Sequence, residues 1–391
     1  MIDYEKVLNP TAADIKPSGI RKYFDIAATM DEVISLSVGE PDFPTPLQVR
    51  EAGIESLKAG KTKYTSNRGL EELRVEISKY VDRKYAAKYD PETEILVSVG
   101  GSEAIDMAVR ALVKPGDEVI IPQPSYVCYE PITRLAGGVP VIIETKAEED
   151  FKLTPQALKN AITEKTKLLI LPYPCNPTGA VMNKADLEKI ADVLRDTDIM
   201  VVSDEIYGEL TYGAKHASIA AIDGMHERTV LVNGFSKAFS MTGWRMGYAC
   251  APAPVMDIIN KIHQYAIMCA PTMSQYAALT ALRTCDEQVE EMVAEYDRRR
   301  KIAVDGFNAV GLTCREPGGA FYVFPSIKST GLTSEEFCTR VLLEKHVAVV
   351  PGTAFGDSGE GHIRVSYCYN TEHIKEGIRR IGEFVKELQT K

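Results

Sequence analysis

The chain has 391 residues, of which 45% are hydrophobic and 26% charged, and its formal net charge is -10. This length and composition exclude a disordered chain and predict a globular protein of about two or three domains. Because acidic and basic residues are interleaved, the charge disfavours nucleic acid and anionic membranes as main partners.

The sequence carries no targeting or metal-binding signal. Residues 1–6 lack the basic and apolar regions of a signal peptide, and no apolar run approaches the roughly 20 residues that span a bilayer. The eight cysteines have no Cys-x-x-Cys spacing, and the six histidines do not cluster. We therefore expect a cytoplasmic protein with reduced cysteines and no metal site.

From about residue 94, short β-rich runs alternate with amphipathic helical stretches. This alternation favours a mostly parallel sheet covered by helices. The predicted strands are residues 95–99, 118–121, 139–144, 167–171, 199–203 and 229–232, and the predicted helices between them include residues 102–113, 154–162 and 185–196.

The pattern changes after residue 284. Residues 285–309 predict one long charged helix, and residues 311–325 read as strands interrupted by Pro317, Gly318 and Gly319. An amphipathic helix is predicted at residues 372–388. We interpret this part of the chain as a second, smaller α/β domain.

A candidate anion site occurs at residues 97–104, where a predicted strand turns through glycine into a helix. Such a turn exposes backbone N–H groups and the positive end of the helix dipole. Gly101, Ser102 and Glu103 would provide backbone donors, and Ser102 also a hydroxyl group. Taken alone, a Gly-Gly-Ser turn is more often an ordinary helix cap.

A candidate reactive amine is Lys237, which stands among small and apolar residues. Desolvation favours a neutral amine that can attack a carbonyl group. Arg245, eight residues later, offers a guanidinium fork for a phosphate. The alternative is a loop lysine that reaches solvent.

Two further charged residues stand in apolar strands. Asp204 ends the predicted strand 199–203, where a buried carboxylate is costly unless it pairs with a cation; its alternative role is a solvated strand end. Arg364 lies in the apolar run 363–367 and needs an anionic partner, which would be a substrate carboxylate or an internal ion pair.

Several motifs follow one another in a fixed order: Asn-Pro-Thr-Gly at 176–179, Asp-Glu-x-Tyr at 204–207, and Ser-Lys at 236–237 with Arg245 after it. This order resembles the class I/II aminotransferases, which are pyridoxal-phosphate enzymes of fold type I. The resemblance runs from Gly39 in Gly-Glu-Pro-Asp-Phe to Arg364 in His-Ile-Arg-Val-Ser-Tyr, nearly the whole chain.

The resemblance implies a domain plan. It implies an α/β fold with a large cofactor-binding domain, residues 46–284, whose mostly parallel seven-stranded sheet lies between helices. It also implies a smaller α/β domain, residues 285–391. The N-terminal segment, residues 1–45, would join the small domain and close over the site.

The resemblance also implies roles around the ring of pyridoxal 5′-phosphate. Lys237 binds the cofactor covalently and later moves the α-proton of the substrate. Asp204 pairs with the pyridine nitrogen, while Tyr207 and Asn176 bind the ring oxygen. Tyr126 stacks on the ring; without the resemblance it reads as a buried core tyrosine.

For the phosphate, the resemblance implies a cup formed by Gly101, Ser102, Ser236 and Arg245. Tyr64 would reach the phosphate of the other subunit, which implies a homodimer with shared active sites. Arg364 would bind the substrate α-carboxylate, and it would be assisted by Gly39 and Asn176.

The expected reaction is a ping-pong transfer of the amino group of an L-amino acid to a 2-oxo acid such as 2-oxoglutarate. A dicarboxylate-specific branch has lysine where this chain has Ser102, which argues against strict aspartate specificity. Some members have a phosphate-binding serine where Gly234 stands here. Residues 18–23 and 241–245 look most like aromatic and N-acetyl-diaminopimelate aminotransferases of Gram-positive bacteria. Aromatic donors are therefore the first expectation, with Phe321 and Ile20 as pocket walls.

Other functions remain open at this stage. A carbon–sulfur β-lyase uses the same ring chemistry, and N-acetyl-diaminopimelate or aspartate are alternative donors. A cofactor-bound sensor domain is disfavoured by the acidic balance and by the lack of an N-terminal DNA-binding extension. A nicotinamide enzyme is disfavoured because Gly100-Gly101 lacks the Gly-x-Gly-x-x-Gly spacing.

Overall fold

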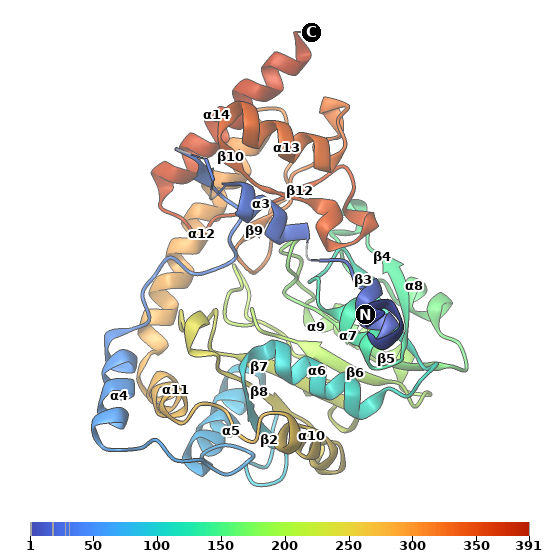
Figure 1. Cartoon of the computed structure of the whole chain (residues 1–391), viewed down its shortest axis with the longest axis vertical. Helices are drawn as coiled ribbons and strands as arrows, with labels where there is room; N and C mark the ends of the chain where they lie inside the picture. Colours follow the sequence, from blue (N-terminus) through green and yellow to red (C-terminus); the bar gives the residue numbers. More distant parts are fainter. Residues whose placement is uncertain (1, 18, 28, 31, 391) are drawn as a thin grey trace.

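The computed structural model describes every residue except 1, 18, 28, 31 and 391. Its centre is a seven-stranded sheet with the order β2-β8-β7-β6-β5-β3-β4 (Figure 1). All neighbouring strands are parallel except where β8 pairs antiparallel with β2 and β7. The predicted fold class is thereby confirmed. The strands are β2 (Ile95–Ser98), β3 (Glu118–Gln123), β4 (Val139–Glu144), β5 (Thr166–Leu171), β6 (Met200–Asp204), β7 (Thr229–Gly234) and β8 (Gly247–Cys250).

Helices cover both faces of this sheet. In β5, Leu168 and Ile170 belong to the core under one helical layer, while Leu169 and Leu171 belong to the core under the other. Strands buried on both faces read as continuous apolar runs, which explains why the sequence located them well. The helices are α4 (Leu47–Lys58), α5 (Glu71–Tyr85), α6 (Gly100–Leu112), α7 (Tyr129–Leu135), α8 (Pro155–Ala161), α9 (Lys184–Leu194), α10 (Ala253–Ala266) and α11 (Thr272–Thr284).

The C-terminal part has its own apolar core around Phe307, Phe337 and Phe384. Three helices surround it: α12 (Asp286–Ala309), α13 (Ser334–Lys345) and α14 (Thr371–Gln389). The long charged helix and the terminal helix occur as predicted. Its antiparallel sheet has the order β11-β12-β9, with β9 at Tyr322–Val323, β11 at Val350–Pro351 and β12 at Ile363–Ser366.

Two predictions about strands differ from the structure. Within residues 311–325 only β9 is a strand, because the segment around Gly318 and Gly319 packs closely on Val181 as irregular chain. β8 was not predicted, since its Gly-Tyr-Ala-Cys sequence lacks the β-branched residues that favour strands. A Cβ atom on Gly247 would lie 2.5 Å from the carbonyl carbon of Gly100, so glycine lets β8 approach the first turn of α6.

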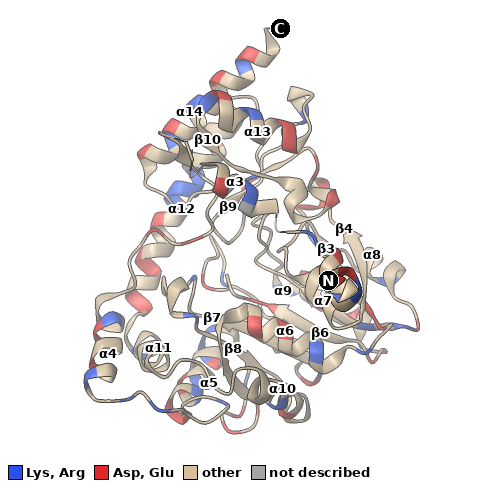
Figure 2. Ribbon diagram, viewed as in Figure 1, with Lys and Arg blue, Asp and Glu red and all other residues tan. Residues whose placement is uncertain are grey.

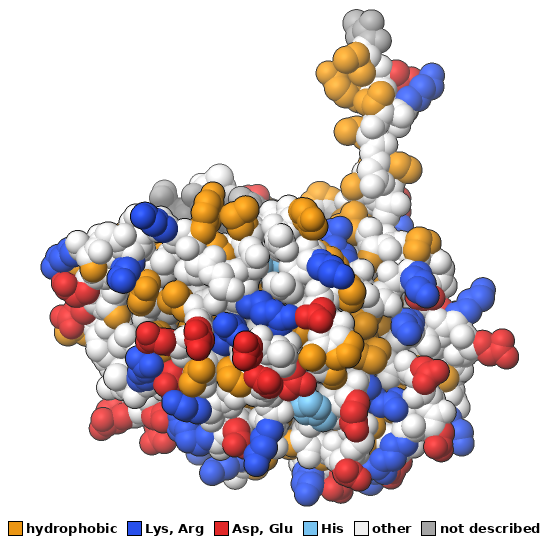
Figure 3. Space-filling model, turned by 90° about the horizontal axis from the view of Figure 1, so that it is seen from below, with side chains coloured by type: hydrophobic (Ala, Val, Ile, Leu, Met, Phe, Trp, Pro, Cys, Tyr) orange, Lys and Arg blue, Asp and Glu red, His pale blue; other side chains and the backbone are white. Residues whose placement is uncertain are grey.

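The N-terminal segment contacts distant parts of the chain. Its first helices, α1 (Tyr4–Val7) and α2 (Pro10–Asp14), contain no buried residue, and they project from the body as a slender arm (Figure 3). After α3 (Gly19–Ala27), the short strand β1 (Ile34–Ser35) pairs in parallel with β10 (Val347–Ala348). Residues 34–35 thus extend the C-terminal part of the fold.

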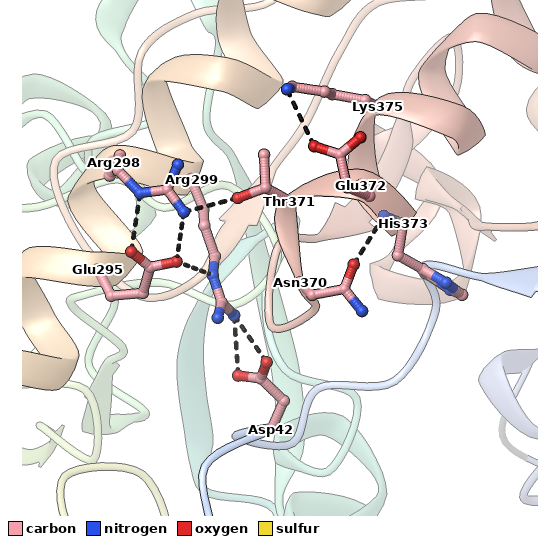
Figure 4. A network of polar contacts seen from close by, with 9 residues as sticks. All are labelled: Asp42, Glu295, Arg298, Arg299, Asn370, Thr371, Glu372, His373 and Lys375. Atoms are coloured by element: carbon pink, nitrogen blue, oxygen red, sulfur yellow. Dashed lines mark hydrogen bonds and ion pairs between the residues drawn. The ribbon is translucent and has the colours of Figure 1, made fainter.

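An ionic network fixes the next stretch of this segment (Figure 4). Both carboxylate oxygens of Asp42 accept hydrogen bonds of 2.8 Å from Nη1 of Arg299 on α12. Glu295 binds both Arg299 and Arg298, and Arg298 donates to the Thr371 hydroxyl at the start of α14. The chain around Asp42 is therefore tied to two helices of the C-terminal part.

Charges of both signs alternate along the outer helices, as α12 and α14 show in Figure 2. Many are i,i+3 or i,i+4 pairs, which contribute little stability each when exposed. Among the described residues, no helix is both long and apolar enough to cross a membrane.

Candidate active site

A cavity of about 300 Å³ lies where the carboxyl ends of β6 and β7 meet the first turn of α6. Ligands of open α/β sheets bind at this edge. Eleven of the predicted residues line it: Gly39, Gly101, Ser102, Tyr126, Asn176, Asp204, Tyr207, Ser236, Lys237, Arg245 and Arg364. Ile20 also lines the cavity.

Three predicted residues do not line it, and one is Glu103, whose carboxylate oxygen lies 2.9 Å from Nδ1 of His263. Phe321 is fully buried behind the wall, where its ring centroid is 5.6 Å from the Lys237 amine. Tyr64 is 80% exposed on the surface.

Lys237 follows the last residues of β7, and its amine enters the cavity. Nζ donates a 2.7 Å hydrogen bond to the carbonyl oxygen of Gly39 and lies 5.9 Å from the centre of the Tyr207 ring. Burial lowers the pKa of Lys237 to about 8. About a tenth of the amine is therefore neutral at pH 7, far more than for an ordinary lysine, and the neutral amine is the form that nucleophilic or basic chemistry requires.

Asp204 is the last residue of β6 and is 6% exposed. Its Oδ2 accepts a 2.6 Å hydrogen bond from the Tyr129 hydroxyl, and its Oδ1 accepts one from the Ile206 amide. Burial raises the pKa of Asp204, and the hydrogen bond from Tyr129 opposes that rise. A carboxylate held in this way suits a cationic group in the cavity.

The anion site combines a helix start with a guanidinium group. Gly101 and Ser102 lie in the first turn of α6, a helix of 13 residues. Arg245 reaches the same turn, because a Cβ atom on Gly100 would lie 2.7 Å from its Nη2. Nη1 of Arg245 donates to the Thr242 carbonyl, which fixes the group. Backbone donors, the helix dipole and a guanidinium group thus converge on one end of the cavity.

Arg364, on β12, is buried at another wall of the cavity. Its Nη1 donates to Asn176 Oδ1 at 3.0 Å and its Nη2 to the Ser37 carbonyl at 2.5 Å. The buried Nε has no partner, and within the described chain no carboxylate forms an ion pair with Arg364. The internal ion pair considered from the sequence is absent from this part, so the guanidinium group retains capacity for an external anion.

Six residues that line the cavity were not predicted from the sequence, and two of them contact predicted site residues through side-chain hydroxyl groups. Tyr129 contacts Asp204, and Tyr322 contacts Tyr207. Both are buried aromatic residues next to predicted ones, Tyr126 and Phe321, and nothing in the local sequence separates them from ordinary core residues.

The model of the family "Aminotransferase class I and II" matches residues 31–381. The chain belongs to this family. This aminotransferase is 52% identical to the "Putative aminotransferase YugH" of Bacillus subtilis, over 97% of this chain and 98% of the relative. It is 49% identical to an aspartate aminotransferase of Pyrococcus abyssi (95% and 97% covered), and 44% identical to "Aromatic-amino-acid aminotransferase 2" of Thermococcus litoralis (95% and 97% covered).

Solved structures agree with this assignment. The aminotransferase superposes with a TM-score of 0.92 on the aspartate aminotransferase of Thermus thermophilus with maleate, at 38% identity, covering 96% of this chain and 99% of that one. It also matches the aromatic aminotransferase of Pyrococcus horikoshii with a TM-score of 0.90 at 45% identity, covering 95% and 99%. The predicted family, fold and transaminase activity are confirmed, and the names of the relatives differ in substrate.

Proposed function

We propose that this aminotransferase binds pyridoxal 5′-phosphate in the cavity and transfers the amino group of an aromatic L-amino acid to a 2-oxo acid such as 2-oxoglutarate. The observation that carries the proposal is the placement of Lys237, Asp204 and the anion site around one cavity. These groups match the aldehyde, pyridine nitrogen and phosphate of that cofactor.

The donor set fits the cofactor group by group. Gly101, Ser102, Ser236 and Arg245 would hold the phosphate, because they combine helix-start N–H groups with hydroxyls and a guanidinium group. Asp204 would hold the pyridine nitrogen in its protonated form.

The remaining wall would orient the ring. Tyr207 and Asn176 would bind the ring oxygen, and Tyr126 would stack on the ring face. The bound cofactor supplies an electron sink for the bond that breaks at the substrate α-carbon.

The residues of the chain then have distinct tasks. Arg364, with Asn176 and the Gly39 backbone, would bind the α-carboxylate and so fix which α-carbon bond faces Lys237. Nζ of Lys237, with its lowered pKa, would take the α-proton as a general base. Burial of Asp204 and Tyr207 excludes water from the ring contacts.

The charge of the cavity supports aromatic donors over aspartate. Among the described lining residues the cations are Lys237, Arg245 and Arg364, and each already has a proposed role. A second substrate carboxylate would therefore lack a cation of this chain, where Ser102 stands in place of lysine. Ile20, Ile105 and Ile206 give the cavity apolar walls.

We further propose a homodimer and a division into three parts. Tyr64, at 80% exposure, is available to reach the phosphate of a second subunit. Residues 1–45 would move with a small domain, 285–391, as the pairing of β1 with β10 supports. Residues 46–284 would form the large cofactor-binding domain.

One experiment tests cofactor and donor together. The purified protein is loaded with pyridoxal 5′-phosphate and mixed in turn with phenylalanine, tyrosine, aspartate and N-acetyl-diaminopimelate, while absorbance follows conversion to the pyridoxamine form. We expect phenylalanine and tyrosine to react fastest. Aspartate far outrunning both would overturn the donor assignment. Release of pyruvate and ammonia from cystathionine without an acceptor would point instead to β-elimination.

A further inference from the structure

Tyr322 stands between two residues that have separate proposed tasks. Its hydroxyl oxygen lies 2.9 Å from the Tyr207 hydroxyl oxygen. The carbon of the Arg364 guanidinium group lies 4.5 Å from the centre of its ring. Tyr322 is 1% exposed and lines the cavity.

Sheet register explains this position. Tyr322 on β9 pairs with Ser366 on the antiparallel strand β12. Arg364 precedes Ser366 by two residues, so its side chain is on the same face, diagonal to Tyr322 and within reach of an aromatic ring. Gly39 completes the arrangement, because a Cβ atom there would lie 2.0 Å from the Tyr322 oxygen.

The hydroxyl pair has a defined polarity once Tyr207 acts on a ligand. A tyrosine has a single hydroxyl proton. If Tyr207 gives that proton to the ring oxygen of the cofactor, the proton between the two tyrosines must come from Tyr322. Donation from Tyr322 then polarises Tyr207 and strengthens its hydrogen bond to the ligand.

The ring contact acts on Arg364. A guanidinium group over an aromatic face gains a cation–π attraction. The ring of Phe355 makes a second such contact, with its centre 4.8 Å from the guanidinium carbon of Arg364. Burial raises the pKa of the Tyr322 hydroxyl, so it stays protonated and neutral beside the cation.

We propose that Tyr322 is a positioning residue that links the ring-oxygen contact to the carboxylate contact. Its hydroxyl supports Tyr207, and its ring supports Arg364. The proposal rests on the proposed function, because it uses the roles of these two residues. The hydroxyl and the ring of Tyr322 can be tested separately, each with its own substitution.

The test compares Tyr322→Phe with Tyr322→Leu. Tyr322→Phe removes only the hydroxyl, so we expect the pH midpoint of the visible absorbance of the lysine-bound cofactor to rise by roughly 0.3–1 unit. The KM for phenylalanine should change less than about twofold, since the ring remains. Tyr322→Leu also removes the aromatic face, and KM should rise about 3- to 30-fold.

Tyr212→Phe is the matched control. Tyr212 is also buried, and its hydroxyl contacts the Ala320 carbonyl and the Tyr367 hydroxyl outside the cavity. We expect it to lower the melting temperature without moving the absorbance midpoint or KM. Equal midpoints for wild type and Tyr322→Phe would overturn the hydroxyl link, and an unchanged KM for Tyr322→Leu would overturn the ring link.

Equilibrium dialysis of the apo-protein with pyridoxal 5′-phosphate distinguishes a failure of the proposed function from a failure of the role of Tyr322. If the wild type does not bind the cofactor, the proposed function fails. If the wild type binds it and neither Tyr322 variant differs from wild type in midpoint or KM, only the role of Tyr322 fails. A Tyr322→Phe variant that melts like Tyr212→Phe and shifts the midpoint supports positioning over a general loss of stability.

Discussion

Tyr129 donates its hydroxyl hydrogen to Oδ2 of Asp204 over 2.6 Å, in a place where both side chains are buried. The contact stabilises the ionised carboxylate against the desolvation that raises the pKa of Asp204. Tyr129 therefore supports Asp204, the proposed partner of the pyridine nitrogen of the cofactor.

Removing this hydroxyl should shift the acid limb of the pH–rate profile. In Tyr129→Phe the pKa of Asp204 rises further, so the carboxylate is lost at a higher pH as the solution is acidified. We expect the acid midpoint of kcat/KM to move up by about one unit. Tyr126→Phe, which keeps a ring in the same cavity wall, should leave the midpoint in place. A Tyr129→Phe profile that superposes on the wild type would show that the Tyr129 hydroxyl does not set the ionisation of Asp204.

Lys237 should govern both cofactor attachment and proton transfer. Replacing it with alanine should reduce turnover by about 10²–10⁴-fold from proton transfer alone. Near-normal transamination by the variant would refute the assignment. Reduction of the loaded protein with borohydride, followed by peptide mass spectrometry, should place the cofactor on Lys237 in the wild type and leave the alanine variant unlabelled.

The lowered pKa of Lys237 also predicts how attachment depends on pH. Only the neutral amine attacks an aldehyde. The rate at which the apo-protein captures pyridoxal 5′-phosphate should therefore rise with pH and level off above about 8, the pKa of the buried amine. Stopped-flow absorbance measures this rate. A rate that keeps rising toward pH 10.5, the ordinary lysine value, would show an amine that burial does not affect.

Arg364 should control substrate affinity more than cofactor binding. Arg364→Lys keeps the charge but loses the fork that contacts Asn176 and Ser37. We expect kcat/KM for amino-acid donors to fall about 10- to 100-fold, with unchanged affinity for pyridoxal 5′-phosphate. Arg300→Lys is the control, since Arg300 is also buried but binds the Pro317 carbonyl away from the cavity. Equal losses of kcat/KM in the two variants would show that the loss comes from a general disturbance of the fold and not from substrate binding by Arg364.

Tyr64 tests the proposed shared site. Tyr64→Phe should weaken binding of pyridoxal 5′-phosphate about tenfold, because a hydrogen bond to a charged phosphate is lost across the dimer. Tyr265→Phe is the control, since Tyr265 is 88% exposed. Light scattering should show a dimer for both variants. A monomeric wild type that binds the cofactor normally would contradict the shared site.

Local signals located the sheet and the charged residues of the cavity, whereas Gly39, Tyr126, Asn176, Tyr207 and Ser236 were expected only from the resemblance to the family. Apolar runs buried on both faces defined the parallel strands, and Lys237, Asp204 and Arg364 stood out as charges within apolar surroundings. Tyr129 and Tyr322 could not be found in this way, because their roles depend on contacts with Asp204, Tyr207 and Arg364 that are distant in sequence. Strand β8 was not predicted, because its position depends on a tertiary contact in which Gly247 packs against Gly100.

The ionic network of Figure 4 offers a stability test with an internal control. Arg299 is 7% exposed and binds Asp42 through two hydrogen bonds, three residues from Gly39 in the cavity wall. In the same figure, Glu372 and Lys375 form a pair at 83% and 56% exposure. Asp42→Asn should lower the free energy of unfolding by about 1.5–3 kcal/mol, since it leaves a buried guanidinium group with a weaker partner. Glu372→Gln should cost less than about 0.5 kcal/mol.

Asp42→Asn should also affect the active site. Because Asp42 anchors the chain that carries Gly39, Asp42→Asn should also raise KM for amino-acid donors, while Glu372→Gln should not. Urea unfolding and steady-state kinetics of the two variants measure both effects. If Asp42→Asn lost stability with an unchanged KM, the network would stabilise the fold without positioning Gly39. Equal losses of stability in the two variants would show that burial of Arg299 adds nothing to its ion pair.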